Sequence, residues 1–220
     1  SGSTSEPKGV LVSHENLIAN QRMIQSTFHT TKDSVVTGWL PLFHDMGLIG
    51  NVMQALYAGA HCVLLSPVSF LQAPVSWLRA ISAFGGTISG GPDFGYVHCV
   101  RKVRDEDLEG LDLSRWEMAY NGSEPVRRET IESFCGRFAQ AGFRRSAFAP
   151  CYGLAEATLL VAVDHPWASP RGTDATAEDR PSVSCGRPAP GQSVRIVDPE
   201  TRTVKADGDV GEIWVSGANV

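Results

Sequence analysis

The sequence predicts an α/β protein with a doubly wound, mainly parallel sheet and a smaller β-rich subdomain at its C-terminal end. Short apolar runs alternate with amphipathic segments through residues 1–163, as expected for helices between parallel strands. Residues 164–181 are rich in Pro, Asp, Ser and Thr and have no hydrophobic periodicity, which indicates a linker or a reduced insertion. Residues 192–198 and 211–216 alternate like antiparallel strands. We therefore expect the β-rich subdomain to start within 182–220.

Apolar runs bounded by turn residues predict the strands, and apolar residues three to four positions apart predict the helices. Ser13 has the side chain of an N-cap, so a helix should begin after it. Trp77, Ile81 and Phe84 share one helix face and should point inward. Pro125 suits the first turn of a helix. The expected strands are 10–12, 34–40, 61–65, 87–89, 116–120 and 148–152, and the expected helices are 13–28, 48–57, 74–84, 96–104 and one starting near residue 125.

Composition excludes several classes of function. A net charge of −5 and a pI near 5.7 argue against general affinity for nucleic acid or for an anionic membrane surface. The five cysteines are widely spaced and form no CxxC pair, so we read them as reduced, mostly buried thiols of a cytoplasmic protein. No apolar run is long enough to span a membrane, and no signal peptide opens the chain.

The first ten residues, SGSTSEPKGV, read as a phosphate-binding loop. Ser3, Thr4 and Ser5 offer hydroxyl donors, and Lys8 brings a positive charge to any phosphate that they surround. The spacing is not that of a Walker loop, because no Ser or Thr follows Lys8 as that motif requires. The alternative is a flexible Gly/Ser terminus.

Further turns follow the expected parallel strands, and active-site groups of open α/β sheets gather at such strand ends. These turns are PLFHDMGLIG at 41–50, NGSEP at 121–125 and YGLAEAT at 152–158. His44, in the first turn, can hydrogen-bond a reacting group, although a buried histidine that caps a strand end is the alternative. An α/β hydrolase is excluded, because the sequence lacks a GxSxG elbow.

Seven segments together resemble the adenylate-forming superfamily, in the same order along nearly the whole chain. HDMGLIG after Trp-Leu-Pro, NGSEPVR, and Leu154 and Ala155 in YGLAEATL make the chain most similar to the fatty acyl-AMP ligases, as a fragment of their large N-terminal domain. Related acyl-CoA synthetases and peptide-synthetase adenylation domains more often have Thr before the glutamate. The segments are SGSTSEPKGVLVSHENL, WLPLFHDMGLIG, SGGPDFGY, YNGSEPVR, CYGLAEATL, SCGRPAPGQSVRIVD and GEIWVSG.

The resemblance implies a ligase that uses ATP and Mg²⁺ to convert a fatty acid into an acyl adenylate and pyrophosphate. The adenylate is then captured by the phosphopantetheine thiol of an acyl carrier protein, a partner that coenzyme A replaces poorly. Acyl-CoA synthetases and amino-acid adenylation domains are the enzymatic alternatives. A non-catalytic nucleotide-binding or scaffolding fragment is the alternative from another class.

The resemblance also implies an ATP site. Ser3, Thr4, Ser5 and Lys8 would hold the β and γ phosphates, and Glu156 would bind magnesium, although a lone glutamate is as often a helix-surface residue. Adenine would stack on Tyr152, unless that ring belongs to the core. The other expected nucleotide-binding residues act through backbone shape or wall the base, and they are Asn121, Gly122, Ser123, Glu124, Pro125, Gly153 and Leu154.

The implied catalytic residues are Lys8, His44 and Glu156, with His44 between the nucleotide and the acyl group. Asp45 would anchor its own loop. The residues expected to line an alkyl tunnel are Met46, Leu48, Ile49, Met53, Leu56 and Phe94, and core packing explains any one of them equally well.

Two departures from the family pattern limit the resemblance. The insertion that fatty acyl-AMP ligases carry after YGLAEAT is shorter than expected at 164–181. The sequence also stops before the family's ribose-binding aspartate, its hinge and its C-terminal lysine. We therefore expect the 220-residue piece to be inactive alone.

Overall fold

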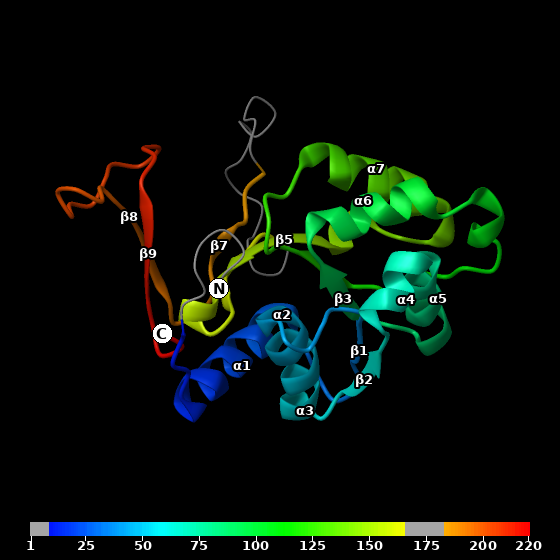
Figure 1. Cartoon of the computed structure of the whole chain (residues 1–220), viewed down its shortest axis with the longest axis horizontal. Coiled ribbons are helices and arrows are strands. Elements are labelled where there is room, and N and C mark those ends of the chain that lie inside the picture. Colours follow the sequence, from blue (N-terminus) through cyan, green and yellow to red (C-terminus); the bar gives the residue numbers. More distant parts are fainter. Residues whose placement is uncertain (1–8, 166–182) are drawn as a thin grey trace.

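A seven-stranded sheet forms the centre of the computed structural model, which describes residues 9–165 and 183–220 (Figure 1). The strand order is β2-β1-β3-β4-β5-β6-β7, with the first five parallel and the last two antiparallel. This confirms the predicted α/β class. The strands are β1 Val35–Gly38, β2 His61–Leu64, β3 Ile88–Gly91, β4 Met118–Asn121, β5 Phe148–Gly153, β6 Leu160–Val163 and β7 Arg187–Pro188.

Helices cover both sides of this sheet. The helices α1, α2 and α3 lie on one side, and α6 and α7 lie on the other (Figure 1). The α-helices are α1 His14–Phe28, α2 Asp45–Gly47, α3 Gln54–Ala58, α4 Pro67–Gln72, α5 Val75–Phe84, α6 Asp93–Lys102 and α7 Arg128–Phe138. The π-helical segment η1 spans Leu48–Met53, and the 3₁₀ turns are η2 Asp105–Leu108, η3 Ala139–Ala141, η4 Arg145–Ala147 and η5 Ala155–Ala157.

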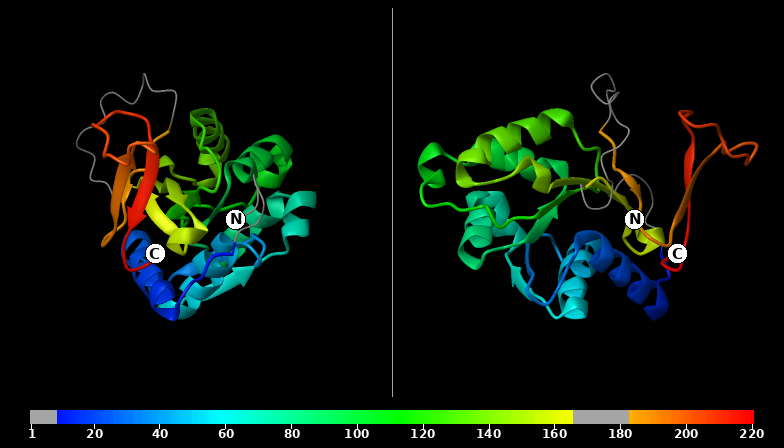
Figure 2. Two further views of the ribbon diagram at one scale, coloured as in Figure 1. Left: turned by 60° about the vertical axis from the view of Figure 1, so that its left-hand side comes forward. Right: turned by 180° about the vertical axis from the view of Figure 1, so that it is seen from behind.

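The predicted antiparallel pair near the C-terminal end is also present. β8 (Ser193–Val197) and β9 (Glu212–Ser216) form a separate two-stranded sheet with five paired positions. This hairpin stands at one end of the molecule, beside the loop between β5 and β6 and the start of α1 (Figure 2). In the described ranges, no helix has both the length and the apolar composition needed to cross a bilayer.

Local sequence signals set the first helix as expected. The Ser13 hydroxyl accepts a hydrogen bond from the Asn16 N–H at 3.0 Å, and the Asn16 side chain accepts one from the Ser13 N–H at 2.9 Å. This reciprocal capping box satisfies two N–H groups that a helix start leaves unpaired. The helix ends at Phe28 and is followed by the C-cap residue His29, whose φ of 53° places it in the left-handed region.

Several expected elements differ in the structure. Residues 10–12 form no strand, and Leu11 is fully exposed, so their apolar pattern does not mark a sheet position. α7 begins at Arg128 rather than near Pro125, because the NGSEP turn continues through an exposed loop. Phe84 is 54% exposed and does not face inward with Trp77.

Other differences lie in segments whose pattern was ambiguous. The helix expected at 48–57 is built from η1 and α3, and α4 was not predicted. β6 was not predicted; it runs antiparallel to β5, so the YGLAEAT turn is the tip of a hairpin. All five cysteines are free as expected; Cys99 and Cys135 are buried, whereas Cys62, Cys151 and Cys185 are only partly buried.

A cluster of aromatic rings fills the core between the sheet and α5 to α7. The Phe134 ring centroid lies 4.5 Å from that of Phe138, 4.9 Å from Tyr96 and 5.0 Å from Phe143. The indole N–H of Trp77 donates to the Ser89 hydroxyl at 2.7 Å. The buried rings therefore combine apolar contact with satisfied polar groups.

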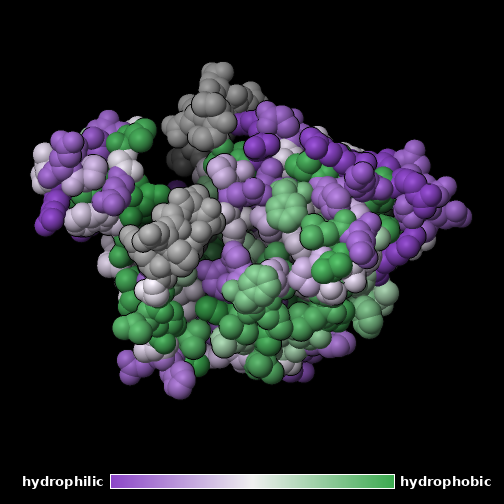
Figure 3. Space-filling view, viewed as in Figure 1, coloured by the Kyte–Doolittle hydropathy of each residue, from purple (hydrophilic) through white to green (hydrophobic). Residues whose placement is uncertain are grey.

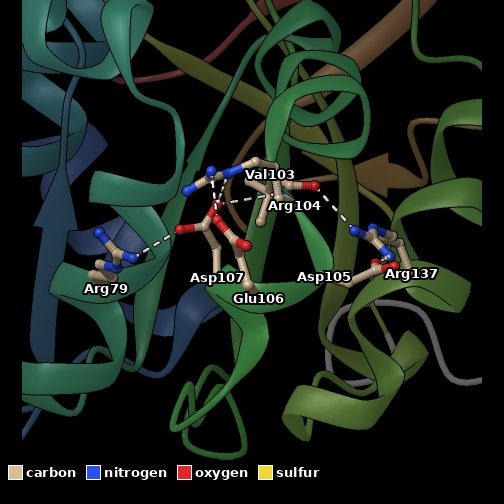
Figure 4. A network of polar contacts seen from close by, with 7 residues as sticks. All are labelled: Arg79, Val103, Arg104, Asp105, Glu106, Asp107 and Arg137. Atoms are coloured by element: carbon tan, nitrogen blue, oxygen red, sulfur yellow. Dashed lines mark hydrogen bonds and ion pairs between the residues drawn. The ribbon is translucent and has the colours of Figure 1, made fainter.

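A network of ion pairs ties α5, η2 and α7 together at the surface (Figure 4). Asp107 accepts hydrogen bonds from Arg79 at 2.8 Å and from Arg104 at 3.1 Å. Arg137 pairs with Asp105 and donates to the Val103 carbonyl at 2.9 Å. Because this network spans three elements, it fixes the otherwise irregular connection after α6.

We predict that Phe134→Ala destabilises the fold by about 3–5 kcal/mol, the usual range for removing a fully buried phenylalanine. Phe84→Ala is the matched control, because the same atoms are removed from a half-exposed ring, and its effect should be under about 1 kcal/mol. Urea denaturation followed by circular dichroism measures both. Equal losses for the two variants would contradict the assigned core.

Candidate functional site

One cavity of about 570 Å³ opens at the carboxyl ends of the parallel strands, beside the β5–β6 hairpin. Its lining combines α1, the loop that follows β1, the end of β4 and the hairpin tip. The lining residues are Ile24, Phe28, Phe43, His44, Asp45, Met46, Gly50, Tyr120, Ser123, Cys151, Tyr152, Gly153, Leu154, Ala155, Leu159 and Leu160.

The structure brings together six of the residues that the sequence predicts for the site. From the expected nucleotide set, Ser123, Tyr152, Gly153 and Leu154 line the cavity. His44 and Met46 line it from the opposite loop. The cavity therefore joins groups expected at the nucleotide with groups expected at the acyl chain.

Other predicted residues lie outside this lining. Asn121 and Ile49 are buried, and Gly122 packs against Cys151, where a Cβ would lie only 2.7 Å from the thiol sulfur. The remaining residues are exposed or partly exposed, and they are Leu48, Met53, Leu56, Phe94, Glu124, Pro125 and Glu156. Ser3, Thr4, Ser5 and Lys8 lie outside the described residues.

The cavity lining also includes residues that were not predicted for it, among them Ile24, Phe28 and Tyr120. Ile24 and Phe28 belong to the apolar face of α1, and the Phe28 ring stacks on Tyr120 with centroids 6.0 Å apart. The Tyr120 hydroxyl donates to the Asn51 side chain at 2.6 Å. The apolar periodicity of α1 was the available signal, but such a stripe is also what core packing requires.

His44 and Asp45 form an ion pair at the cavity wall. The His44 Nδ1 lies 2.7 Å from an Asp45 carboxylate oxygen, and the hydrogen bond with Asp45 raises the pKa of His44 above 6.5. Burial acts to raise the pKa of Asp45, but the hydrogen bond and charge of His44 and the Met46 N–H outweigh it, so that pKa is lowered. The pair therefore favours the charged form of both groups.

The Cys151 thiol and the Tyr152 phenol, which line the cavity, stay protonated at neutral pH. Burial raises the pKa of Cys151 to about 12, so its thiol is not a nucleophile there. Burial, and then the negative charge of Glu156, raise the pKa of Tyr152.

The hairpin tip that carries Glu156 is closed by short backbone bonds. The Leu154 N–H donates to the Leu159 carbonyl at 3.0 Å, and the Leu159 N–H donates to the Ala157 carbonyl at 2.7 Å across Thr158. Thr158 has φ 65° and ψ −57°, a strained γ-turn conformation that costs about 1–3 kcal/mol. Gly153 is required at the base of this tip, because a Cβ there would lie 2.0 Å from the Leu159 carbonyl oxygen.

Asp93 fixes the position of the NGSEP turn, and it was not predicted. Its buried carboxylate accepts hydrogen bonds from the Asn121 side chain at 3.0 Å, the Thr130 hydroxyl at 2.8 Å and the Arg127 N–H at 3.3 Å. Nearby, Glu124 accepts from the Phe94 N–H at 2.7 Å. Both carboxylates act at the start of α6, so they hold the NGSEP turn against that helix.

Hydrophobic surface extends over the side of the molecule formed by α1, α2 and α3 (Figure 3). Its exposed apolar side chains include Ile18 on α1, Phe43 just before α2 and Leu56 on α3. Phe43 also lines the cavity, so apolar surface continues from the outside into the site.

The profile of AMP-binding enzymes matches residues 1–220 of the sequence. The chain belongs to the AMP-binding enzyme family. This confirms the superfamily to which the motifs pointed, and all of the motif-bearing turns fall within the matched range.

Several relatives of this AMP-binding domain are fatty-acid ligases. It is 45% identical to a medium-chain-fatty-acid–[acyl-carrier-protein] ligase, TtuA of Teredinibacter turnerae, with 100% of this chain and 37% of the relative aligned. It is 42% identical to the long-chain-fatty-acid–AMP ligase FadD26 of Mycobacterium marinum, over 100% of this chain and 41% of the relative. The chain thus spans about two fifths of the length of these relatives.

A solved structure shares the same fold. The fatty acyl-adenylate ligase of Legionella pneumophila, crystallised in complex with acyl adenylate and pyrophosphate, superposes with a TM-score of 0.90 and 45% sequence identity. The alignment covers 100% of this chain and 41% of that one. The mainly parallel sheet of this domain is therefore that of the adenylate-forming fold.

We predict that Asp45→Asn lowers the pKa of His44 toward 6.5, because it removes the charge that favours the imidazolium. The stabilisation from the native pair is present below pH 6.5 and is lost as the pH rises through the raised pKa of His44. NMR titration of the His44 ring protons measures the shift. Asp33→Asn, at an exposed carboxylate paired with Lys32, is the control. A pKa of His44 at or below 6.5 in the unmodified protein would contradict this assignment.

Proposed function

We propose that the protein containing this domain activates a fatty acid with ATP, forming an acyl adenylate and pyrophosphate. The observation that carries the proposal is the two-sided lining of the 570 Å³ cavity. One side consists of Ser123 and residues Tyr152 to Leu154, and the other consists of apolar residues such as Ile24 and Met46. His44 lies in the same lining. An acyl adenylate has these two halves, a nucleotide and an alkyl chain, joined at a reactive carbonyl.

The apolar side favours an alkyl chain over an amino acid. A bound amino acid would bring an ammonium group that needs a carboxylate partner. Asp45 is the one carboxylate among the described lining residues, and it is already paired with His44. A fatty acid leaves no such charge to be satisfied, so it suits the lining better.

His44 has the chemistry for the junction between the two halves. Asp45 occupies its Nδ1 side, which leaves Nε2 to donate a hydrogen bond to an oxygen of the substrate carboxylate or the adenylate. In the proposed step, a carboxylate oxygen attacks the α-phosphorus of ATP, and the bond to the departing pyrophosphate breaks. The raised pKa of His44 keeps more of its imidazole protonated and able to donate near neutral pH.

Glu156 fits the role of a magnesium-binding carboxylate. Magnesium is commonly held by one or two carboxylates together with substrate phosphates and water. No group of three or more His, Cys, Asp or Glu side chains that could hold a metal ion occurs among the described residues. Magnesium would neutralise charge on the phosphates. Ser3, Thr4, Ser5 and Lys8 remain the predicted phosphate-binding residues.

The proposed acceptor is the phosphopantetheine thiol of an acyl carrier protein. TtuA, which is 45% identical over 100% of this chain, is named as an acyl-carrier-protein ligase. This name supports a carrier protein rather than coenzyme A as the acceptor. An acyl-CoA synthetase is the alternative.

A substrate panel tests the proposed function. The full-length protein is supplied with ATP, Mg²⁺ and fatty acids of increasing length, and acyl adenylate and pyrophosphate are quantified. Carrier protein or coenzyme A is then offered as the single acceptor. We expect adenylate formation with at least one chain length and transfer to the carrier protein. No adenylate with any fatty acid, or adenylate only with amino acids, would contradict the proposal.

We predict that Glu156→Gln lowers the rate of adenylate formation by about 100-fold, the scale for losing one group that stabilises transition-state charge. The melting temperature should change by under about 2 °C, because Glu156 is exposed. Glu132→Gln, at an exposed position of α7, is the matched control. Equal loss of melting temperature and rate would mark Glu156 as a structural residue instead.

A further inference from the structure

Asn219 lies where the segment after β9 meets the hairpin tip that carries Glu156. The side chain is 1% exposed, and its Nδ2 donates to the Ala157 carbonyl at 2.7 Å. In return, the Thr158 hydroxyl donates to the Asn219 carbonyl at 2.6 Å. These two bonds hold the two residues that directly follow Glu156.

The hairpin tip needs such a restraint because of its backbone. Thr158 is β-branched and 2% exposed, and it stands at φ 65° and ψ −57°. L-residues with a branched side chain rarely adopt this conformation, and it persists only where surrounding contacts hold it. The bonds to Asn219 act on the carbonyl before Thr158 and on the Thr158 side chain itself, so they oppose relaxation of the turn.

Asn219 is in turn anchored to the first helix. The Asn16 side chain at the start of α1 donates to the Ala218 and Val220 carbonyls at 3.0 Å and 3.1 Å. These bonds flank Asn219 on both sides. The segment after β9 is therefore held in place independently of the hairpin tip.

Apolar contacts also join the β8–β9 sheet to the hairpin that carries Glu156. Ala157 and Val161 of the hairpin form a small cluster against which Val194 of β8 and Val215 of β9 pack. The β8–β9 sheet thus contacts the site through the residues next to Glu156 as well as through Asn219.

We propose that Asn219 is a positioning residue for adenylation, which holds the Glu156 carboxylate in its working direction through Ala157 and Thr158. The inference rests on the proposed function of Glu156. It also gives the β8–β9 sheet a role in that function, because this sheet delivers Asn219 to the hairpin tip.

The test uses near-isosteric variants of the full-length protein. Asn219→Asp keeps the size but replaces the Nδ2 donor with an oxygen facing the Ala157 carbonyl, and Thr158→Val removes only the donating hydroxyl. Each variant should raise the Mg²⁺ concentration for half-maximal adenylation by about tenfold, the scale of one lost buried hydrogen bond. The KM for the fatty acid should stay within about twofold. Thr158→Ser should recover most of the loss, and Thr201→Val in the exposed loop after β8 is the matched control.

Hydrogen exchange gives a readout that does not depend on activity. Faster exchange confined to the amides of residues 154–159 in Asn219→Asp and Thr158→Val would support the proposal. Faster exchange throughout the sheet with an equal loss in every kinetic constant would overturn it, because Asn219 would then serve stability alone. An unchanged Mg²⁺ dependence with unchanged exchange would overturn it as well.

The measurements distinguish a failure of the proposed function from a failure of the positioning role alone. If the unmodified protein forms no acyl adenylate, the proposed function fails, and the inference about adenylation fails with it. If the unmodified protein forms adenylate and Glu156→Gln is impaired while both Asn219→Asp and Thr158→Val are not, the positioning role alone is wrong.

Discussion

The buried carboxylate of Asp93 is the interaction on which the arrangement around the NGSEP turn depends. A carboxylate inside a protein costs several kcal/mol unless donors surround it. Here the donors come from β4, from the residue just before α7 and from α7 itself, through Asn121, Arg127 and Thr130. Satisfying one charge therefore fixes the end of a central strand, the start of α6 and the entry to α7 relative to one another. Ser123, in the cavity lining, belongs to the turn thus fixed.

Close contacts that only glycine allows bring the elements around the site together. A Cβ at Gly90 of β3 would lie 2.0 Å from the Tyr120 carbonyl oxygen, and a Cβ at Gly38 of β1 would lie 2.3 Å from the Asn51 side chain. These gaps let Tyr120 and Asn51 meet through their hydrogen bond at 2.6 Å. Tyr120 then presents its ring to the cavity beside Phe28. Contacts within the sheet thus fix the position of Tyr120, and with it part of the cavity wall.

The sequence predicted the alternation of strands and helices and the turns at the strand ends, because period and turn chemistry are local properties. It did not predict the burial pattern of residues 48–53, since helical phase changes in η1. A π-helical turn rotates each residue by less than an α-helix does, so Asn51 faces inward while Leu48 is exposed. Asp93 was missed because its donors are 28 to 37 positions away in sequence. Asn219 was missed for the same reason, at 61 to 62 positions.

Because β6 runs antiparallel to β5, the turn between them is restrained more than a turn between a strand and a helix would be. A turn between a strand and a helix is restrained by a sheet on one side only, but the tip between β5 and β6 continues into paired strands on both. Such a tip gives up its conformational entropy when the domain folds. A ligand that contacts Tyr152 to Ala155 then binds to backbone that is already ordered, so less of the contact energy is spent on ordering and more appears as affinity.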